Sequence, residues 1–544
     1  RAAFARVRRG VSPQRRGVHP PGPPEDTCPG GQIFVVEPIG ELHTLTLVWP
    51  ARELLSARVW HSRAVRLLEV ALAGQNEGSL YADLKKRGFA TGVSFAYGVS
   101  FVDVSTLELE VELTDSGLRH ATEVIDVMLE HVALLTEAVR TGRPNAGNST
   151  LCEMWSDAVA IDTLDFHFQE PMDPADFVSS AATVMHRLPP RDVLGSGAAW
   201  QLDTEVLLSV SRALERLPSL WIVAKGFDGG DDLRHVLEQH VEPIYGTKYL
   251  RGSMPARLAS RWGTSISPQG LIADRRRRPS NARLPAQSTR FVPRKFELQP
   301  VPANGAGERR AAPADVTPPS DVGRYVVFHK PDAEYREPRV TLRCLAATPA
   351  AYQESAEAAA EARMFALALE DGLEVPLAYA ARAGYAWGVG STPLGLSLLV
   401  SGFSGEGLSK VVHHVAGAVV APEITPLRFE ALRRAAMRQT KTERTRPLYE
   451  VAQGYLLEQA LQVPSWNWDE QLGALEEVTR GAALRRGSKM RASSSVTCFA
   501  HGDISPGEAA ALGAELADAL SNQTVPLEQV PLPGVVARPS RSDL

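Results

Sequence analysis

One segment of the sequence constrains the fold most. Its apolar residues first recur at every second position, as in a strand, and then at every third or fourth position, as in a helix. Over Leu107–Leu113 apolar residues alternate with glutamates, which is typical of a strand with one face on a core. Over Leu118–Val139 apolar residues recur at helical spacing, with Thr114 or Ser116 as the N-cap. The chain must therefore bury an amphipathic strand and a long amphipathic helix.

The same strand-then-helix pattern recurs before and after this segment. Alternation or apolar runs predict strands at Leu42–Pro50, Leu220–Lys225, Tyr325–His329, Val340–Ala346, Leu394–Ser401 and Ser494–Ala500. Other segments predict helices at His61–Gly74, about Gly230–His240, about Ala351–Glu370 and after the capping residues Ser505, Pro506 and Glu508. The fold class that follows is α+β, with helices packed on one face of mostly antiparallel or mixed sheets.

Length and composition divide the chain into four stretches. A chain of 544 residues is expected to fold as about two to four units. We expect two folded domains of similar plan, at 31–262 and 323–535. The connection between them, 263–322, is rich in Arg, Pro, Ser and Ala, which resist packing. Residues 1–30 are rich in Arg and Pro, lack an apolar signal segment and are assigned no function.

The overall charge and the scattered cysteines disfavour several classes of protein. A formal net charge of -5 gives no field that would collect nucleic acid or an anionic membrane. The chain has no run of roughly eighteen apolar residues, so no membrane-spanning helix is predicted. The four cysteines stand singly, which favours a reducing compartment such as the cytoplasm, although the Arg-rich start also fits organelle import.

A zinc peptidase needs two histidines about one helical turn apart, with a glutamate that holds the attacking water. The nearest match is HVLEQH, with His235, Glu238 and His240, which has one residue too many for the HXXEH motif. At about 100° per residue, these histidines would point about 140° apart on a helix and could not share a metal ion. We expect surface polar residues on an amphipathic helix, and no catalytic or metal-binding residue in this chain.

Other catalytic patterns are also missing from the sequence. His413 and His414 are adjacent, so they point to different sides of either a helix or a strand. Gly388, Gly390 and Gly395 have the wrong spacing for a nucleotide-binding loop, and the chain has no GxSxG elbow and no P-loop. The serine hydrolase, NTPase and dinucleotide-binding classes therefore have no support.

Two charged runs each have a functional and an ordinary interpretation. Glu108, Glu110 and Glu112 would form an acidic wall for basic substrates, but such a row is usually a solvated sheet face. The run Arg275–Arg278 would bind a polyanion, but basic runs in loops are usually only solvated. The sequence leaves both alternatives open.

Several short stretches together carry a more specific pattern. They are Val36–Pro50, Gly78–Phe89 (with GSL, LK and GF), Glu242–Tyr249 (with YGTKY), Leu284–Leu298 (with LP, FVP and FEL), Tyr379–Gly384 (YAARAG) and Phe499–Ile504 (FAHGDI). In this order they resemble the insulin-degrading enzyme and nardilysin branch of the pitrilysin-type zinc metallopeptidase family. Each stretch alone recurs by chance, but six in the family's order make the resemblance specific.

The resemblance implies a four-domain protease whose two bowl-shaped halves enclose peptides, with zinc held by an HXXEH helix and a later glutamate in the first domain. This chain then supplies the second domain, at 31–262, and the third, at 323–535, and the zinc-binding N-terminal domain is missing. The leading hypothesis is a fragment of a peptide-degrading zinc metalloendopeptidase that shapes the substrate chamber and is inactive alone. The alternative is a non-catalytic homologue that acts as a peptide-binding or scaffold subunit. Homo-oligomerisation stays open.

The resemblance also places an exosite, where a substrate N-terminus pairs as an added strand. Its residues in this chain are Gly74, Gly78, Ser79, Val93, Ser94 and Phe95. The loop 74–80, GQNEGSL, lacks the histidine that the family usually has before the small-residue turn, which leaves substrate anchoring open. In the other interpretation, Gly78 and Ser79 only shape a turn and cap the helix Leu80–Arg87.

Overall fold

The computed structural model describes most of the chain, from residue 30 to residue 530 with gaps. The gaps are residues 52–53, 55–58, 60–61, 101–104, 142–149, 170–171, 186–187, 191, 196–201, 228–232, 267–281, 285–290, 294–295, 301–311, 352–354, 444–445 and 454–465. The leader before residue 30, the basic run Arg275–Arg278 and most of the 263–322 connection lie outside the described residues.

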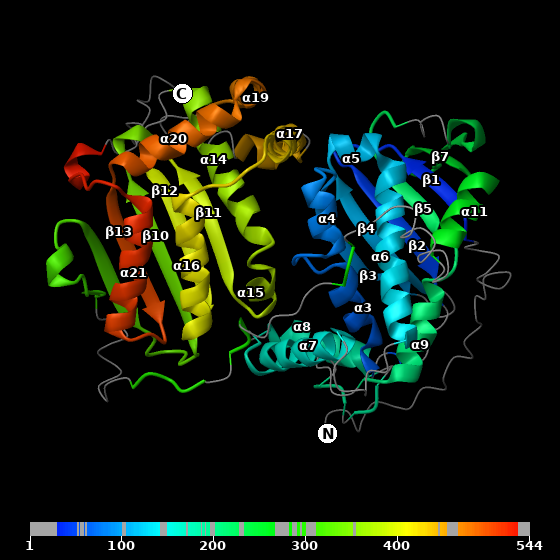
Figure 1. The fold of residues 1–544 in the computed structure, drawn as a ribbon, viewed down its shortest axis with the longest axis horizontal. Helices are drawn as coiled ribbons and strands as arrows, with labels where there is room; N and C mark the ends of the chain where they lie inside the picture. The colour runs from blue at the N-terminus through cyan, green and yellow to red at the C-terminus, as the bar shows by residue number, and fades with distance from the viewer. Residues whose placement is uncertain are drawn as a thin grey trace.

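The first sheet has seven strands in the order β3-β4-β2-β5-β1-β7-β6 (Figure 1). In chain order they are β1 (Gln32–Val36), β2 (Thr44–Pro50), β3 (Ala90–Ser100), β4 (Ser105–Leu113), β5 (Ser219–Val223), β6 (Glu238–Val241) and β7 (Lys248–Ser253). β1 and β5 pair in parallel, whereas the other neighbouring strands pair antiparallel. The sheet is therefore mixed, with β3 at one edge.

Helices pack on one face of this sheet, and α6 crosses that face in Figure 1. The helical segments are α3 (Ala64–Leu72), α4 (Leu80–Lys86), α5 (Asp115–Arg119), α6 (Ala121–Thr141), α7 (Thr150–His167), α8 (Pro174–Val184), α9 (Thr204–Ala213), η3 (Arg234–Val236) and α11 (Ala256–Ser265). The strand predicted at Leu107–Leu113 is confirmed, because its apolar side chains are buried in the core. The predicted long helix is divided at His120 into α5 and α6, and Thr114 caps α5.

The second sheet repeats the arrangement of five strands of the first, from the edge strand β3 to β1. It has six strands in the order β11-β12-β10-β13-β9-β8. They are β8 (Ala314–Asp315), β9 (Tyr325–Pro331), β10 (Arg339–Ala347), β11 (Ala386–Thr392), β12 (Gly395–Phe403) and β13 (Ser495–Gly502). Here β9 and β13 form the parallel pair, as β1 and β5 do, and β11 is the edge strand in the place of β3.

The second unit also carries its helices on one face, where α16 and α21 cross the sheet in Figure 1. Its helical segments are η5 (Pro319–Asp321), η6 (Pro349–Ala351), α14 (Ala356–Glu374), α15 (Ala378–Arg382), α16 (Glu406–Val420), α17 (Pro426–Glu443), α19 (Trp468–Glu477), α20 (Arg480–Ala492), α21 (Pro506–Leu520) and η7 (Leu527–Gln529). The predicted capping box is confirmed at the start of α21, where Ser505 and Glu508 bond reciprocally. The two mixed sheets with their helices confirm the α+β class.

A disulfide joins Cys344 of β10 to Cys498 of β13. The two cysteines are directly opposite in the ladder and lie in the core. Cysteine spacing did not predict this pair, because 154 residues separate its two members. The disulfide also means that the singly placed cysteines no longer support a reducing compartment. Cys152 is free.

The helix predicted at about Gly230–His240 is wrong. Its described part forms the short turn η3 and then β6, in which His240 lies opposite Tyr249 of β7. The two rings stack with their centroids 5.3 Å apart. Pairing with β7 outweighs the helical spacing, since strand preference depends on neighbouring strands that the local sequence does not contain. A smaller difference is that α3 ends at Leu72 with Ala73, rather than Gly74, as its C-cap.

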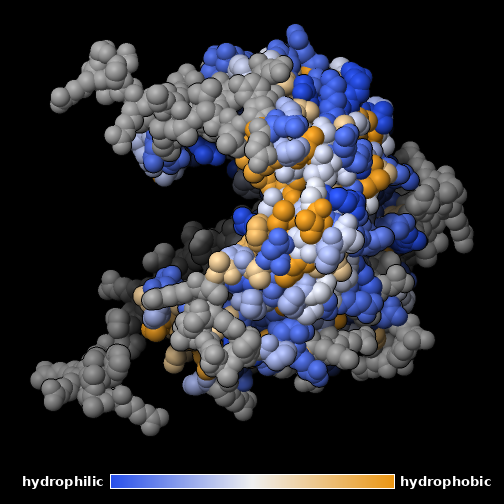
Figure 2. Space-filling model, turned by 90° about the vertical axis from the view of Figure 1, so that its left-hand side faces the viewer, coloured by the Kyte–Doolittle hydropathy of each residue, from blue (hydrophilic) through white to orange (hydrophobic). Residues whose placement is uncertain are grey.

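The surface is hollowed on one side. Figure 2, which looks onto the side that carries β13 and α21 in Figure 1, shows this hollow bordered by hydrophilic residues, with an apolar band beside it. No helix in the described part of the chain is both long enough and apolar enough to cross a membrane.

Candidate functional site

The loop 74–80 leads into α4 through a tight turn. Gly78 has a φ of +84°, a backbone conformation that glycine adopts without strain. The hydroxyl of the buried Ser79 accepts a hydrogen bond from the N–H of Ala82 at 3.1 Å and so caps α4. Gly74 is buried at the start of the loop. Gly78 and Ser79 therefore have the turn and cap roles that the sequence predicted as one alternative.

Two basic side chains lie on either side of this loop. Arg283 pairs with Glu77 at 3.0 Å and passes so close to Gly78 that a Cβ there would lie 2.6 Å from its side chain. His131 of α6 is 2% exposed, and its Nδ1 lies 3.0 Å from the carbonyl oxygen of Val127. Burial lowers the pKa of His131, although the backbone of Gly78 and nearby carboxylates favour its protonated form. The loop therefore has a buried histidine near it and a surface ion pair at Glu77.

The backbone of β3 faces two ways. The N–H of Leu113 in β4 donates to the carbonyl of His43 at 2.8 Å, so Leu113 faces β2 rather than β3. Because residues of antiparallel strands alternate between facing one neighbour and the other, Ser94 bonds to β4 whereas the N–H and C=O of Val93 and Phe95 face away from it. Among the described residues no strand pairs with that side of β3. It is a free edge.

Side chains of β3 alternate in the opposite sense. Val93 and Phe95 are buried in the core on the helical face of the sheet, and Ser94 is exposed on the other, open face. The structure therefore places the three predicted exosite residues of β3 in one edge strand. The backbone groups of Val93 and Phe95 face the free side of this strand, and the side chain of Ser94 is exposed on the open face. The loop residues Gly78 and Ser79 precede α4, which itself contacts β3.

The open face presents a row of polar and aromatic residues that starts at Ser94. Across all seven strands the row is Ser94, Glu110, Thr46, Trp221, Phe34, Arg251 and Glu238. The Thr46 hydroxyl donates to Glu110 at 3.1 Å, and Phe34 and Trp221 stack at 4.5 Å. The predicted glutamate face is thus confirmed, while its role toward basic substrates stays a prediction.

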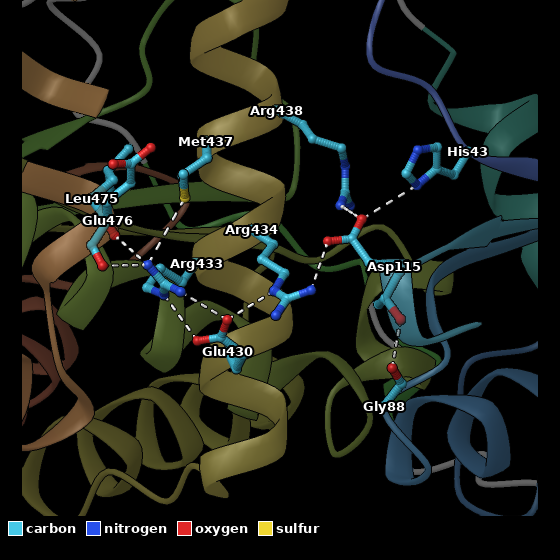
Figure 3. Close-up of polar contacts among 11 residues, drawn as sticks. His43, Gly88, Asp115, Glu430, Arg433, Arg434, Met437, Arg438, Leu475 and Glu476 are labelled. Carbon is cyan, nitrogen blue, oxygen red and sulfur yellow. Dashed lines mark hydrogen bonds and ion pairs between the residues drawn. The ribbon is translucent and has the colours of Figure 1, made fainter. Parts of the chain in front are cut away.

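One contact between helix α17 of the second unit and the first unit is made through an acidic residue. Asp115, in the first turn of α5, accepts hydrogen bonds from Arg434 at 3.1 Å and Arg438 at 2.7 Å, and His43 lies 3.4 Å away (Figure 3). Glu430 of the same helix accepts hydrogen bonds from Arg433 and Arg434, which lower its pKa to about 2. These contacts tie α17 to the positive end of α5.

A second cluster joins the units closer to β3. Arg428 of α17 donates through Nε and Nη2 to Asp371 of α14, at 2.8 and 2.6 Å, and both side chains are 8% exposed. Lys85 of α4 completes the cluster, 3.0 Å from Asp371 and 2.6 Å from Glu374. The Nη1 group of Arg428 donates to the carbonyl oxygen of Ala90, the first residue of β3, at 2.7 Å. No sequence pattern predicted this cluster, because its members come from three distant segments.

A cavity of about 340 Å³ lies beside these contacts. It is lined from the first unit by His43, Thr91 and Glu112, and from the second by Arg438 and Arg446, among others. Burial lowers the pKa of His43, and the nearby Arg438 adds to this effect. The cavity therefore combines a neutral imidazole with charges of both signs.

The described residues do not offer a metal site. No three of their His, Cys, Asp or Glu side chains come together to hold an ion. His240 is on β6, outside any helix, and so it does not share a helical face with His235. On α16, His413 lies 2.9 Å from Glu515, and His414 bonds within its own helix. The zinc ion that the family resemblance implies does not fit the described residues.

Comparison with known proteins gives the family. A model described as the middle or third domain of peptidase M16 matches residues 166–474, and one described as the peptidase M16 inactive domain matches residues 4–140. The chain belongs to the M16 peptidase family, in the branch of insulin-degrading enzyme and nardilysin.

Relatives support this placement along most of the chain. Insulin-degrading enzyme-like 1, peroxisomal, from Arabidopsis thaliana is 24% identical over 497 residues, which are 90% of this chain and 46% of that protein. Insulin-degrading enzyme from Homo sapiens is 23% identical over 456 residues, 82% of this chain and 40% of that protein. The crystal structure of pitrilysin matches 91% of this chain and 49% of its own, with a TM-score of 0.60 and 16% identity, which shows a shared fold. The chain spans about half the length of these relatives.

Proposed function

We propose that this chain forms the peptide-anchoring wall of the substrate chamber in a peptide-degrading zinc metallopeptidase. The observation that carries the proposal is the free edge of β3, which presents the backbone N–H and C=O groups of Val93 and Phe95. An extended peptide adds to such an edge as a further strand, and its main chain supplies most of the affinity. Side-chain identity then matters little, which suits a protease that degrades varied peptides.

The open face next to this edge gives the peptide a second contact surface. Alternate side chains of an added strand point to the same face as Ser94 and lie beside it, with Glu110 one strand farther into the sheet. The aromatic pair Phe34 and Trp221 follows farther along the row. The chamber wall in this proposal is therefore polar near the edge and aromatic toward the middle of the sheet.

Hydrolysis requires a zinc site, which the described residues do not form. In our proposal, zinc is held by a separate N-terminal domain of the full-length protein, and the 31–262 and 323–535 domains, joined at 263–322, enclose and position the substrate. We place the protein in the cytoplasm, with organelle import as the alternative that one peroxisomal relative suggests. The second candidate, a peptide-binding scaffold subunit, shares the anchoring edge and differs only in that the full-length protein would not hydrolyse peptides.

Replacing Val93 by proline tests the edge directly. Val93→Pro removes one edge donor, and proline is tolerated on edge strands, so labelled peptides should bind about ten-fold more weakly while circular dichroism stays unchanged. Val93→Ala is the matched control, because it shortens the same side chain but keeps the N–H, and it should bind within about two-fold of the wild-type chain. Fluorescence anisotropy of a labelled peptide gives the affinities.

Two results would count against the proposal. One is a wild-type chain that binds no extended peptide. The other is a folded Val93→Pro variant with unchanged affinity, which would move the peptide site away from β3.

A further inference from the structure

We propose that Arg428 of the second unit sets the end of the peptide-binding edge and makes peptide anchoring depend on the docking of α17. This inference rests on the proposed function, since it assigns a positioning role at the same edge. Arg428 lies 338 residues from Ala90 in the sequence, yet its guanidinium bonds to the first carbonyl of β3.

The carbonyl of Ala90 belongs to the free side of β3. Ala90 lies opposite Leu113, whose own N–H is directed to His43 on the other side of β4. In an antiparallel pair this makes Ala90 and Leu113 a non-hydrogen-bonded pair, so the Ala90 carbonyl points away from β4. Arg428 occupies this acceptor at 2.7 Å. A peptide strand can therefore pair with Val93 and Phe95 but meets Arg428 where β3 begins.

Arg428 is itself held firmly. Two of its nitrogens bond to one carboxylate oxygen of Asp371, and Lys85 approaches the same oxygen at 3.0 Å. Both Arg428 and Asp371 are almost fully buried. Moving the guanidinium away would therefore leave the buried negative charge of Asp371 with fewer positively charged partners, which costs free energy. The remaining nitrogen of the guanidinium, Nη1, is thereby held at Ala90, the first residue of β3.

The second unit also holds the helix that precedes β3. Lys85 and Tyr81 of α4 both contact Glu374 of α14. Between α4 and β3, Gly88 has a φ of +71°, and a Cβ at this position would lie 2.7 Å from the side chain of Leu427 in α17. The turn from α4 into β3 is therefore packed against the two helices that carry Arg428 and Asp371. Since a peptide and α17 both act on β3, each should strengthen the other's attachment.

The test compares Arg428→Met with Arg438→Met in the full chain. Arg438 is on the same helix, is 15% exposed and pairs with Asp115 across the same interface, so its hydrogen bond goes to α5 and not to the backbone of β3. We expect Arg428→Met to weaken peptide binding about ten-fold, within the usual range of coupling between sites, and Arg438→Met to stay within about two-fold. Hydrogen exchange of the 90–96 segment, read by mass spectrometry without peptide, should speed up in Arg428→Met and not in Arg438→Met.

Arg428→Lys guards against misfolding, because it keeps a positive charge beside Asp371 but cannot bond both Asp371 and Ala90 with a guanidinium fork. It should fold and bind peptide with intermediate affinity. Unchanged affinity and unchanged exchange in folded Arg428→Lys and Arg428→Met would overturn the inference, and so would equal losses in Arg438→Met. If the wild-type chain binds no peptide, the proposed function fails, and the exchange of the 90–96 segment alone then decides whether Arg428 positions β3.

Discussion

The edge strands of the two sheets begin in the same way but differ in how their free sides are bonded. β3 follows α4 through Gly88, and β11 follows α15 through Gly384, and both glycines have positive φ angles. Counting from these turns, Val389 of β11 occupies the place of Val93 in β3. The N–H of Val389 donates to Glu370 of α14 at 3.0 Å. The second edge is thus bonded within its own unit at the position where the first edge is open.

This difference shows how one topology serves two purposes. Exposed edges invite pairing with other chains, and proteins usually cover or interrupt them. In the second sheet a carboxylate from α14 interrupts the edge, whereas in the first sheet Arg428 bonds only its beginning. In our proposal the first edge therefore receives a peptide, whereas the second edge is closed. A second contrast is the disulfide, which joins β10 to β13 but has no counterpart between β2 and β5 in the described part of the first sheet.

The largest expected effect concerns that disulfide. Replacing both Cys344 and Cys498 by alanine should lower the free energy of unfolding of the second unit by about 2–4 kcal/mol, because the bond restricts the unfolded chain over a long loop. Thermal melting with and without a reductant measures this. The reductant should lower the wild-type midpoint and leave the double variant unchanged, and Cys152→Ala serves as the control. If the reductant does not change the melting midpoint of the wild-type chain, the disulfide does not distinguish the stability of the two sheets.

A smaller effect is expected at the interrupted edge. Glu370→Ala leaves the N–H of the buried Val389 without its acceptor, which should cost about 1–3 kcal/mol of stability. Glu370→Gln keeps an acceptor and should cost less. Peptide affinity should not change in either variant if β3 is the anchoring strand. Equal destabilisation by the two substitutions, seen in denaturant unfolding, would mean that the hydrogen bond to Val389 is not what closes this edge.

The smallest effect concerns pH and the loop before α4. Burial holds the pKa of His131 below its ordinary value, so the folded chain keeps this residue neutral while the unfolded chain takes up a proton below about pH 6.5. Stability is therefore fully present above that pH and falls as the pH drops toward the lower folded pKa. His131→Phe should make the loss of stability between about pH 7 and 5.5 shallower.

His413→Phe is the control for this measurement, because the His413 side chain is 80% exposed. Part of the pH dependence should remain in every variant, since burial also lowers the pKa of His43 and of His329. If the slope of stability against pH is unchanged in His131→Phe, then His131 does not contribute to the pH dependence of stability.

Much of the fold was predictable from local pattern. The alternation at Leu107–Leu113 predicted β4 and its buried face, and the Ser505–Glu508 combination predicted the start of α21, because side-chain period and capping depend on residues within one element. The repeated strand-then-helix pattern predicted the α+β class, and six family-like segments predicted the family. The helix predicted at about Gly230–His240 failed where the decisive contact, pairing with β7, lies outside the local sequence.

The sequence by itself therefore determined the buried face of β4, the capped start of α21 and which family the chain joins, since each of these follows from short-range spacing or from ordered motifs. Only the tertiary structure decided the register that brings Cys344 to Cys498, the free side of β3 and the bond from Arg428 to Ala90. These features join residues that are 154 and 338 positions apart. They depend on how separate elements pack against one another, and the period of a single element carries no information about its neighbours.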